Sequence, residues 1–171
     1  MTAVNDRYAK AERLGILTQA VGLALWQLQI LEGSTAQFFV LVDQAERGMG
    51  EEKGDALVKN AQRKTFGGSL TQLAKTKKLP VTLLARFQVL LKERNWLVHS
   101  SRTDSNKALI DDLSFARLQS RLEAITDEAG RLLKEISEQS QTFVISKGIP
   151  SEVIEAKTAQ ILSQWHSALN E

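Results

Sequence analysis

The residues of this 171-residue chain that are best suited to chemistry lie in one stretch, Glu93-Arg94-Asn95-Trp96-Leu97-Val98-His99. Histidine transfers protons near neutral pH, and arginine keeps its charge and binds phosphate oxygens through two parallel hydrogen bonds. Cleavage of RNA without a metal ion needs proton transfer at the ribose 2′-hydroxyl and at the leaving 5′-oxygen, together with positive charge beside the phosphorane. Arg94 and His99 therefore have the residue types for metal-free phosphodiester chemistry.

Arg94 has an unusual position in its predicted helix. The residues around it form an apolar stripe on one helical face, at Phe87, Leu90, Leu91, Leu97 and Val98. Arg94 falls in the middle of this stripe, where a core leucine is expected. Because a guanidinium keeps its proton, it must pair with an anion, reach solvent along its stem, or bind an anionic ligand in a cleft. His99 lies about 140° further round the helix, on a polar flank with Asn95 and Arg102.

A structural role is open for the same residues. In that interpretation, Arg94 forms a buried ion pair with an acidic residue of a neighbouring helix, and His99 only flanks this pair. Trp96, on the face opposite the stripe, packs on another helix or lines an interface. The second histidine of the chain, His166, follows Trp165 and is interpreted as a surface or packing residue.

The charges are distributed unevenly along the chain. The segment Lys59–Lys107 contains eleven Lys or Arg residues against Glu93 and Asp104, so it carries +9, whereas the whole chain carries only +2. A basic segment around a candidate site indicates an anionic partner, and RNA is the partner we expect. The RNA-binding candidates besides the motif are Arg102, Lys92, Lys75, Lys77 and Lys78. The alternative is that these cations form ordinary solvated helix faces.

Composition narrows the class of protein. The chain has no Cys and only two His, and it lacks the spacing of known metal-binding motifs, so we expect no metal ion and no cofactor. No apolar run is predicted to approach the ~20 residues of a membrane span, and the charged start lacks the order of a signal peptide. We therefore expect a cytoplasmic protein without membrane contact. Its length suits a single domain, residues 1–171.

Two long helices are predicted from apolar residues that recur every three or four positions. The first series runs from Leu14 to Ala45 with Thr35 as its interruption, and Gly33-Ser34 marks a point where this helix could bend or break. The second helix is predicted from about Leu109 to Phe143, with its apolar series between Phe115 and Ile136. We expect the two seams to pack against each other.

Shorter helices are predicted around the motif. One covers Glu51–Lys64, and the next covers Leu70–Lys78 after a Gly67-Gly68 turn, with Ser69 as its N-cap. The glycine pair could instead bind phosphate through backbone N–H groups, although the Walker residues and a preceding strand are missing.

Proline and polar residues set the remaining boundaries. Pro80 is predicted to occupy the first position of the motif helix, and the polar stretch Ser100–Lys107 is predicted to be a loop. Gly148 ends the second long helix, and Pro150 opens a last helix. Because no segment alternates with period two, the fold class is all-α, and we predict an antiparallel bundle of five or six helices.

The motif resembles a known family signature. Arg94-Asn95-x-x-x-His99 has the form of the Arg-x-x-x-x-His signature of the HEPN superfamily, in which a polar residue directly follows the arginine. The Thr65-Phe66-Gly67 element and the all-α pattern are also similar to small bacterial HEPN proteins. The resemblance implies a HEPN-like helical bundle, with Arg94 and His99 as the catalytic pair and Asn95 as the supporting polar residue.

The resemblance also implies an activity and partners. Many members of the superfamily are metal-independent endoribonucleases of toxin–antitoxin, phage-defence or RNA-processing systems, and homodimers are common among them. A homodimer agrees with the residues, because one chain supplies one suitable histidine and a twofold pairing of motif helices would supply two to a single cleft. Other members have lost catalysis, so the alternative function is a HEPN-like helical adaptor that binds a protein partner such as an antitoxin or another defence-system component.

Overall fold

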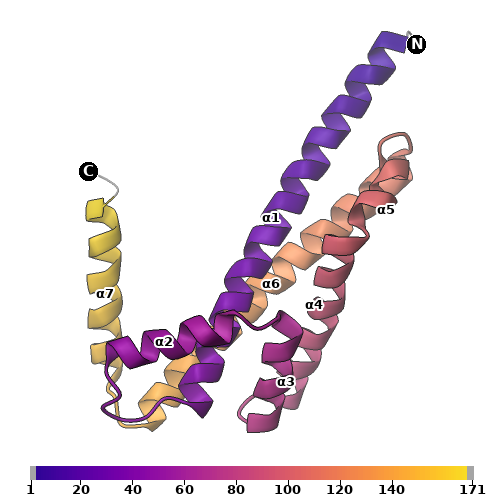
Figure 1. The fold of residues 1–171 in the computed structure, drawn as a ribbon. Helices are drawn as coiled ribbons and strands as arrows, with labels where there is room; N and C mark the ends of the chain where they lie inside the picture. Colours follow the sequence, from indigo (N-terminus) through magenta and orange to yellow (C-terminus); the bar gives the residue numbers. More distant parts are fainter. Residues whose placement is uncertain (1–2, 169–171) are drawn as a thin grey trace.

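The computed structural model describes residues 3–168, with side chains described for residues 6–167 except Asp104. Within this range the chain forms α helices and no strand (Figure 1). The helices are α1 (Ala3–Asp43), α2 (Glu51–Gln62), α3 (Phe66–Thr76), α4 (Val81–His99), α5 (Ser101–Ala108), α6 (Asp112–Ser146) and α7 (Ser151–Ala168). The predicted all-α class is confirmed, although the described residues form seven helices and the prediction was five or six.

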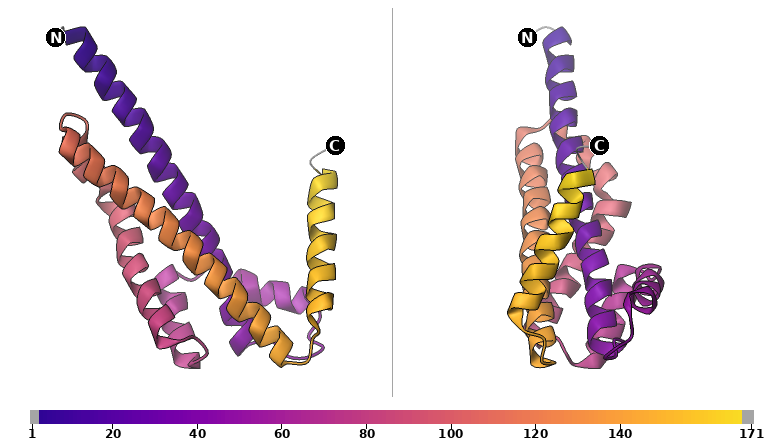
Figure 2. Two further views of the ribbon diagram at one scale, coloured as in Figure 1. Left: turned by 180° about the vertical axis from the view of Figure 1, so that it is seen from behind. Right: turned by 90° about the vertical axis from the view of Figure 1, so that its left-hand side faces the viewer.

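The two long helices α1 and α6 pack along one another, as their apolar seams predict (Figures 1 and 2). The buried residues of the seams are Leu17, Ala24, Leu28, Leu31 and Phe38 on α1, and Leu118, Leu122, Ile125, Ala129, Leu132 and Ile136 on α6. Thr35, the interruption in the first series, is also fully buried, because its hydroxyl donates to the Leu31 carbonyl at 2.7 Å. A threonine whose hydroxyl is bonded within its own helix can therefore continue an apolar seam.

The direction of the helices differs from the predicted antiparallel bundle. Arg13 near the start of α1 pairs with Asp112 at the start of α6, and Phe38 and Ile136 line one cavity near the other end. Helices α1 and α6 therefore run parallel, and α4 runs antiparallel to both (Figure 1). The intervening α4 carries the chain back across the molecule, so that α6 starts at the end where α1 starts.

The start of α3 differs from the predicted glycine turn. The N-cap is Thr65, whose hydroxyl oxygen accepts a hydrogen bond from the Gly68 N–H at 3.1 Å, so Gly67 and Gly68 lie in the first turn of the helix. Ser69 is buried inside α3 and does not cap it. A Cβ on Gly67 would lie 3.3 Å from a Leu91 methyl group, so this glycine permits close packing of α3 on α4.

The predicted loop Ser100–Lys107 is wrong, because most of it forms helix α5. Ser101 donates from its hydroxyl to the Leu97 carbonyl at 2.5 Å, and Ser105 donates to the Ser101 carbonyl at 2.6 Å. The polar side chains thus bond to the preceding helical turn, while Ala108 is fully buried. Boundaries elsewhere shift slightly: α1 continues through Gly33-Ser34 and ends before Ala45, and Pro80 is the N-cap of α4 and not its first residue.

Two helical segments carry exposed apolar surface. On α1, no charged residue occurs between Arg13 and Glu32. By length and composition alone, the part of this helix from Asp6 to Asp43 is long and apolar enough to cross a membrane. This finding corrects the prediction that no apolar run approaches a membrane span, although a core helix of a soluble protein passes the same test. Trp26 of α1 is 69% exposed, and Trp165 of α7, which stands away from the other helices in Figure 2, is 66% exposed.

The α1–α6 seam predicts the largest sensitivity to core truncation. Leu122→Ala should lower the free energy of unfolding by about 2 to 5 kcal/mol, because Leu122 is fully buried and its removal leaves a cavity. The matched control is Leu113→Ala on the same helix, where the side chain is 58% exposed and the change should be within about 0.5 kcal/mol. Urea unfolding followed by circular dichroism measures both, and equal losses would contradict the assigned core.

Candidate active-site cleft

The predicted site residues Arg94, Asn95 and His99 line one open cleft of about 490 Å³. The cleft lies between α4, α1 and the segment that joins α2 to α3. Its other lining residues are Glu32, Arg63, Lys64, Thr65, Phe66, Gly67 and Leu91. Asn95 and His99 are exposed, and His99 is the last residue of α4. The structure therefore brings the motif residues together on one solvent-accessible surface.

Arg94 lies at the edge of the core and contacts an acid from another helix. Its side chain is 30% exposed, and its Nε donates to Glu32 Oε1 on α1 at 2.9 Å. Its Nη1 lies 3.5 Å from Asn95 Oδ1, at the long limit for a hydrogen bond. The predicted stripe is buried at Phe87, Leu90 and Leu97, whereas Val98 is 47% exposed. The ion pair that the structural interpretation requires is thus present, but it faces the cleft and is only partly buried.

Three cleft residues were missing from the sequence-based site. Glu32 was identifiable only as the charge that ends the uncharged stretch of α1. Arg63 and Lys64 follow α2, where basic residues complement the helix macrodipole, and they also line the cleft. Lys64 donates from Nζ to Gln72 Oε1 at 2.6 Å and lies 5.5 Å from the ring centroid of Phe39, which holds its stem in place.

The other RNA-binding candidates lie elsewhere on the surface. Lys75, Lys77 and Lys78 are at the C-terminal end of α3, Arg102 is on α5, and Lys92 is on α4. All five side chains are exposed, and none of them lines the cleft. These candidates are therefore not part of the wall of the cleft.

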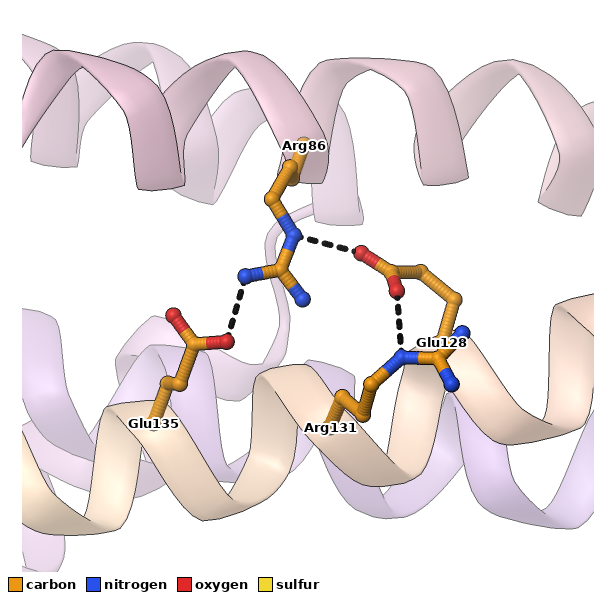
Figure 3. A network of polar contacts seen from close by, with 4 residues as sticks. All are labelled: Arg86, Glu128, Arg131 and Glu135. Atoms are coloured by element: carbon orange, nitrogen blue, oxygen red, sulfur yellow. Dashed lines mark hydrogen bonds and ion pairs between the residues drawn. The ribbon is translucent and has the colours of Figure 1, made fainter.

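The side of α4 away from the cleft is held to α6 by charged groups (Figure 3). Arg86 donates from Nε to Glu128 at 2.7 Å and also bonds Glu135, while Arg131 donates to Glu128 at 2.9 Å. The hydrogen bonds that Arg86 donates to Glu128 and Glu135 raise the pKa of Arg86 above its ordinary value, and the bond that Glu128 accepts from Arg86 lowers the pKa of Glu128. This network holds α4, which carries the motif, against α6.

A second contact of the same kind lies nearer the motif. Arg121 of α6 bonds both carboxylate oxygens of Glu93, from Nε at 2.7 Å and from Nη2 at 3.3 Å. Its guanidinium carbon lies 3.4 Å from the ring centroid of Trp96, so this tryptophan packs against α6, as one of its two interpretations predicts. Glu93 and Trp96 flank Arg94, and their contacts therefore set the orientation of the motif.

Comparison with known proteins adds no assignment to this geometry. No family model, curated protein sequence or solved structure matches the chain. Within the described part of the chain, no group of three or more His, Asp or Glu side chains is placed to hold a metal ion. The second histidine, His166, is exposed on α7 and does not line the cleft.

The contact between Arg94 and Glu32 should have a measurable but modest effect on stability. Fully buried pairs lose about 3 to 5 kcal/mol when one partner is removed, and exposed pairs contribute about 0.2 to 1 kcal/mol. Because the side chains of Arg94 and Glu32 are 30% and 26% exposed, we expect a coupling of about 1 kcal/mol. Urea unfolding of Arg94→Leu, Glu32→Leu and the double variant measures it.

A matched control for this cycle is the pair Lys10–Asp6 on α1, whose side chains are 45% and 65% exposed. Its coupling should be no more than about 0.5 kcal/mol. If the Arg94–Glu32 coupling is as small as that of the control, the pair does not hold α4 to α1.

Proposed function

We propose that this chain is a metal-independent endoribonuclease of HEPN type. The observation that carries the proposal is the cleft, because it joins Arg94, Asn95 and His99 to two further cations, Arg63 and Lys64. Three cations and one carboxylate around an open cleft favour a polyanion, and the proton-transfer group stands beside them. The resemblance of the motif to the HEPN signature supports RNA as the substrate and a toxin, phage-defence or RNA-processing role.

The proposed chemistry is transesterification at a phosphodiester bond. The ribose 2′-oxygen loses its proton to a base and attacks the phosphorus, and the bond from phosphorus to the 5′-oxygen breaks. His99, in its protonated form, donates a proton to the leaving 5′-oxygen, so the products carry a 2′,3′-cyclic phosphate and a 5′-hydroxyl. The Arg94 guanidinium stabilises the charge that develops on the phosphorane, and Asn95 orients the guanidinium.

We propose Glu32 as the base within the same chain. It lies in the cleft with His99, and its carboxylate already contacts Arg94. One hydrogen bond uses only part of the accepting capacity of a carboxylate, so Glu32 can still receive the 2′-hydroxyl proton. Arg94 would then contact both the base and the phosphate, which places the attacking oxygen and the phosphorus near each other. In this mechanism, α1 of the same chain supplies the second proton-transfer group, which the sequence analysis expected from a second protomer.

The activity makes a direct prediction. The purified protein should cleave RNA in the presence of EDTA, and His99→Ala should lower the rate about 10²- to 10⁴-fold because the general acid is removed. Arg94→Ala should remove roughly 3 kcal/mol of transition-state stabilisation, by analogy with a single oxyanion donor. Gel analysis of end-labelled RNA measures both, and His166→Ala serves as the control for the loss of a histidine. Wild-type protein without activity, or His99→Ala with full activity, would contradict the proposal.

The origin of the base is tested separately with Glu32→Gln. This substitution keeps an oxygen that can accept from Arg94 Nε but removes the proton acceptor, so the cleavage rate should fall about 10²-fold or more while thermal unfolding changes little. If the rate is unchanged and His99 is still required, the base is a second His99 from another protomer. In that case Arg94 and His99 retain their roles, and only the assignment of Glu32 is wrong.

A second candidate function is the catalytically inactive adaptor. The exposed apolar side chains of α7 favour it, because such surface on a helix that stands apart suits a protein partner. They are Val153, Ile161, Leu162 and Trp165. This alternative is preferred if neither Arg94→Ala nor His99→Ala changes RNA integrity while the Arg94–Glu32 pair proves structural.

A further inference from the structure

A groove between α1 and α6 lies on the side of this helix pair that faces away from α4. It encloses about 460 Å³, and its apolar lining residues are Phe38, Leu41, Leu133 and Ile136. The other lining residues that the structure describes are serines and one glutamine, so this part of the surface carries no charge. Leu41 follows Glu32 by nine residues, and Ser137 follows Glu128 by nine residues, and both of these acids contact α4. Nine residues turn a helix by about 180°, so the groove and α4 lie on opposite sides of both long helices.

Helix α7 carries an apolar stripe of the kind that packs in such a groove. Ile154, Ile161 and Trp165 follow one another at intervals of seven and four residues, so they share one face of the helix, with Thr158 between them. All the described side chains of α7 except that of Ile154 are exposed. Among the other helices, α7 contacts chiefly the end of α6, and it stands apart from the rest (Figure 1). Helix α7 therefore has the seam of a bundle helix but is not packed in the bundle.

The length of the chain between groove and stripe allows the two to meet. Helix α7 lies on the side of α1 and α6 that is away from α4, and the right-hand view of Figure 2 shows it in front of both. Residues 147–150 join α6 to α7, and Gly148 among them has a φ of +86°. Ile136 lies ten residues before the end of α6, and Ile161 lies ten residues after the start of α7. Ten residues span about 15 Å of helix, so α7 folded back along α6 brings Ile161 level with Ile136.

We propose that α7 of the same chain docks in the groove between α1 and α6. Rotation within the linker 147–150 closes α7 onto the groove, where it lies antiparallel to both long helices. Ile161 and Trp165 then pack against Leu41 and Leu133, and the apolar surface of both faces is removed from water. The short linker favours this occupant over a helix of another molecule, because it keeps the effective concentration of α7 at the groove high.

The docked state leaves the candidate cleft unchanged. The groove and the cleft share no lining residue and lie on opposite sides of α1 and α6. Docking therefore places α7 on one side of the long helices as α4 lies on the other, with the cleft open. The inference does not depend on ribonuclease activity, because it concerns a different surface and other residues.

Disulfide trapping in the full chain tests the proposal, because the chain has no cysteine of its own. Ser140 lines the groove, and Thr158 in the stripe reaches nearly the same level when α7 is docked. The variant with Ser140→Cys and Thr158→Cys should therefore form an intrachain disulfide on mild oxidation. The matched control combines Ser140→Cys with Ala156→Cys, since Ala156 lies near the same level but about 200° away from Thr158 around α7. The first pair should oxidise about tenfold faster or more than the control pair.

Non-reducing gel electrophoresis at micromolar protein measures the disulfides, and circular dichroism confirms that each variant is folded. Ile161→Asp added to the first pair should slow its oxidation about tenfold, because a charge replaces an apolar side chain in the groove, whereas Ser163→Asp on the polar side of α7 should not. A cross-linked monomer with these dependences supports the proposal. Equal rates for the two pairs mean that α7 moves without docking, and disulfide-linked dimers mean that another molecule fills the groove. Either of these results, or the absence of any cross-link, overturns the proposal.

Discussion

The parallel packing of α1 against α6 is the constraint on which the rest of the structure depends. The contact between their buried seams is more extensive than that between any other two helices, and they leave a shared surface on which α4 lies in the opposite direction. The side of α4 that faces inward buries Phe87, Leu90 and Leu97. Its two remaining flanks then have different neighbours, with α6 on one side and the end of α2 on the other. This arrangement determines which residues pair with the charged side chains of α4.

The charged residues on the two flanks of α4 differ in how completely they are paired. Toward α6, Arg86, Glu93, Arg121 and Glu128 neutralise one another in close pairs. Toward the cleft, among the lining residues that the structure describes, Glu32 is the one acid against Arg63, Lys64 and Arg94. Paired charges across a groove fix geometry and add little field, whereas unbalanced cations in a cleft attract an anion. This contrast favours the cleft, and not the more apolar groove between α4 and α6, as the site for the proposed RNA substrate.

The sequence predicts the parts of this structure that depend on periodicity. The two long seams, the class of fold and the place of Arg94 within an apolar stripe all follow from side chains placed at about 100° intervals. The parallel direction of α1 and α6 does not, because seam periodicity is the same in either direction. Helix α5 was missed because Ser101 and Ser105 bond to backbone carbonyls, so a polar segment is helical without an apolar face. The start of α3 was misplaced because Thr65 and Ser69 both have cap chemistry, and the packing of Gly67 on Leu91 favours Thr65.

The candidate site shows the same division between local and long-range information. Arg94, Asn95 and His99 lie within six residues of one another, so local spacing alone could bring them together. Glu32 is 62 residues from Arg94, and its role depends on how α1 crosses α4. An arginine in an apolar stripe needs an anion, solvent or a ligand, and only the fold shows that its partner is a partly exposed carboxylate in the same cleft as a histidine. A carboxylate in that position can hold the guanidinium and also receive a proton, so the contact that favours a structural role for Arg94 is equally the contact that a single-chain active site requires.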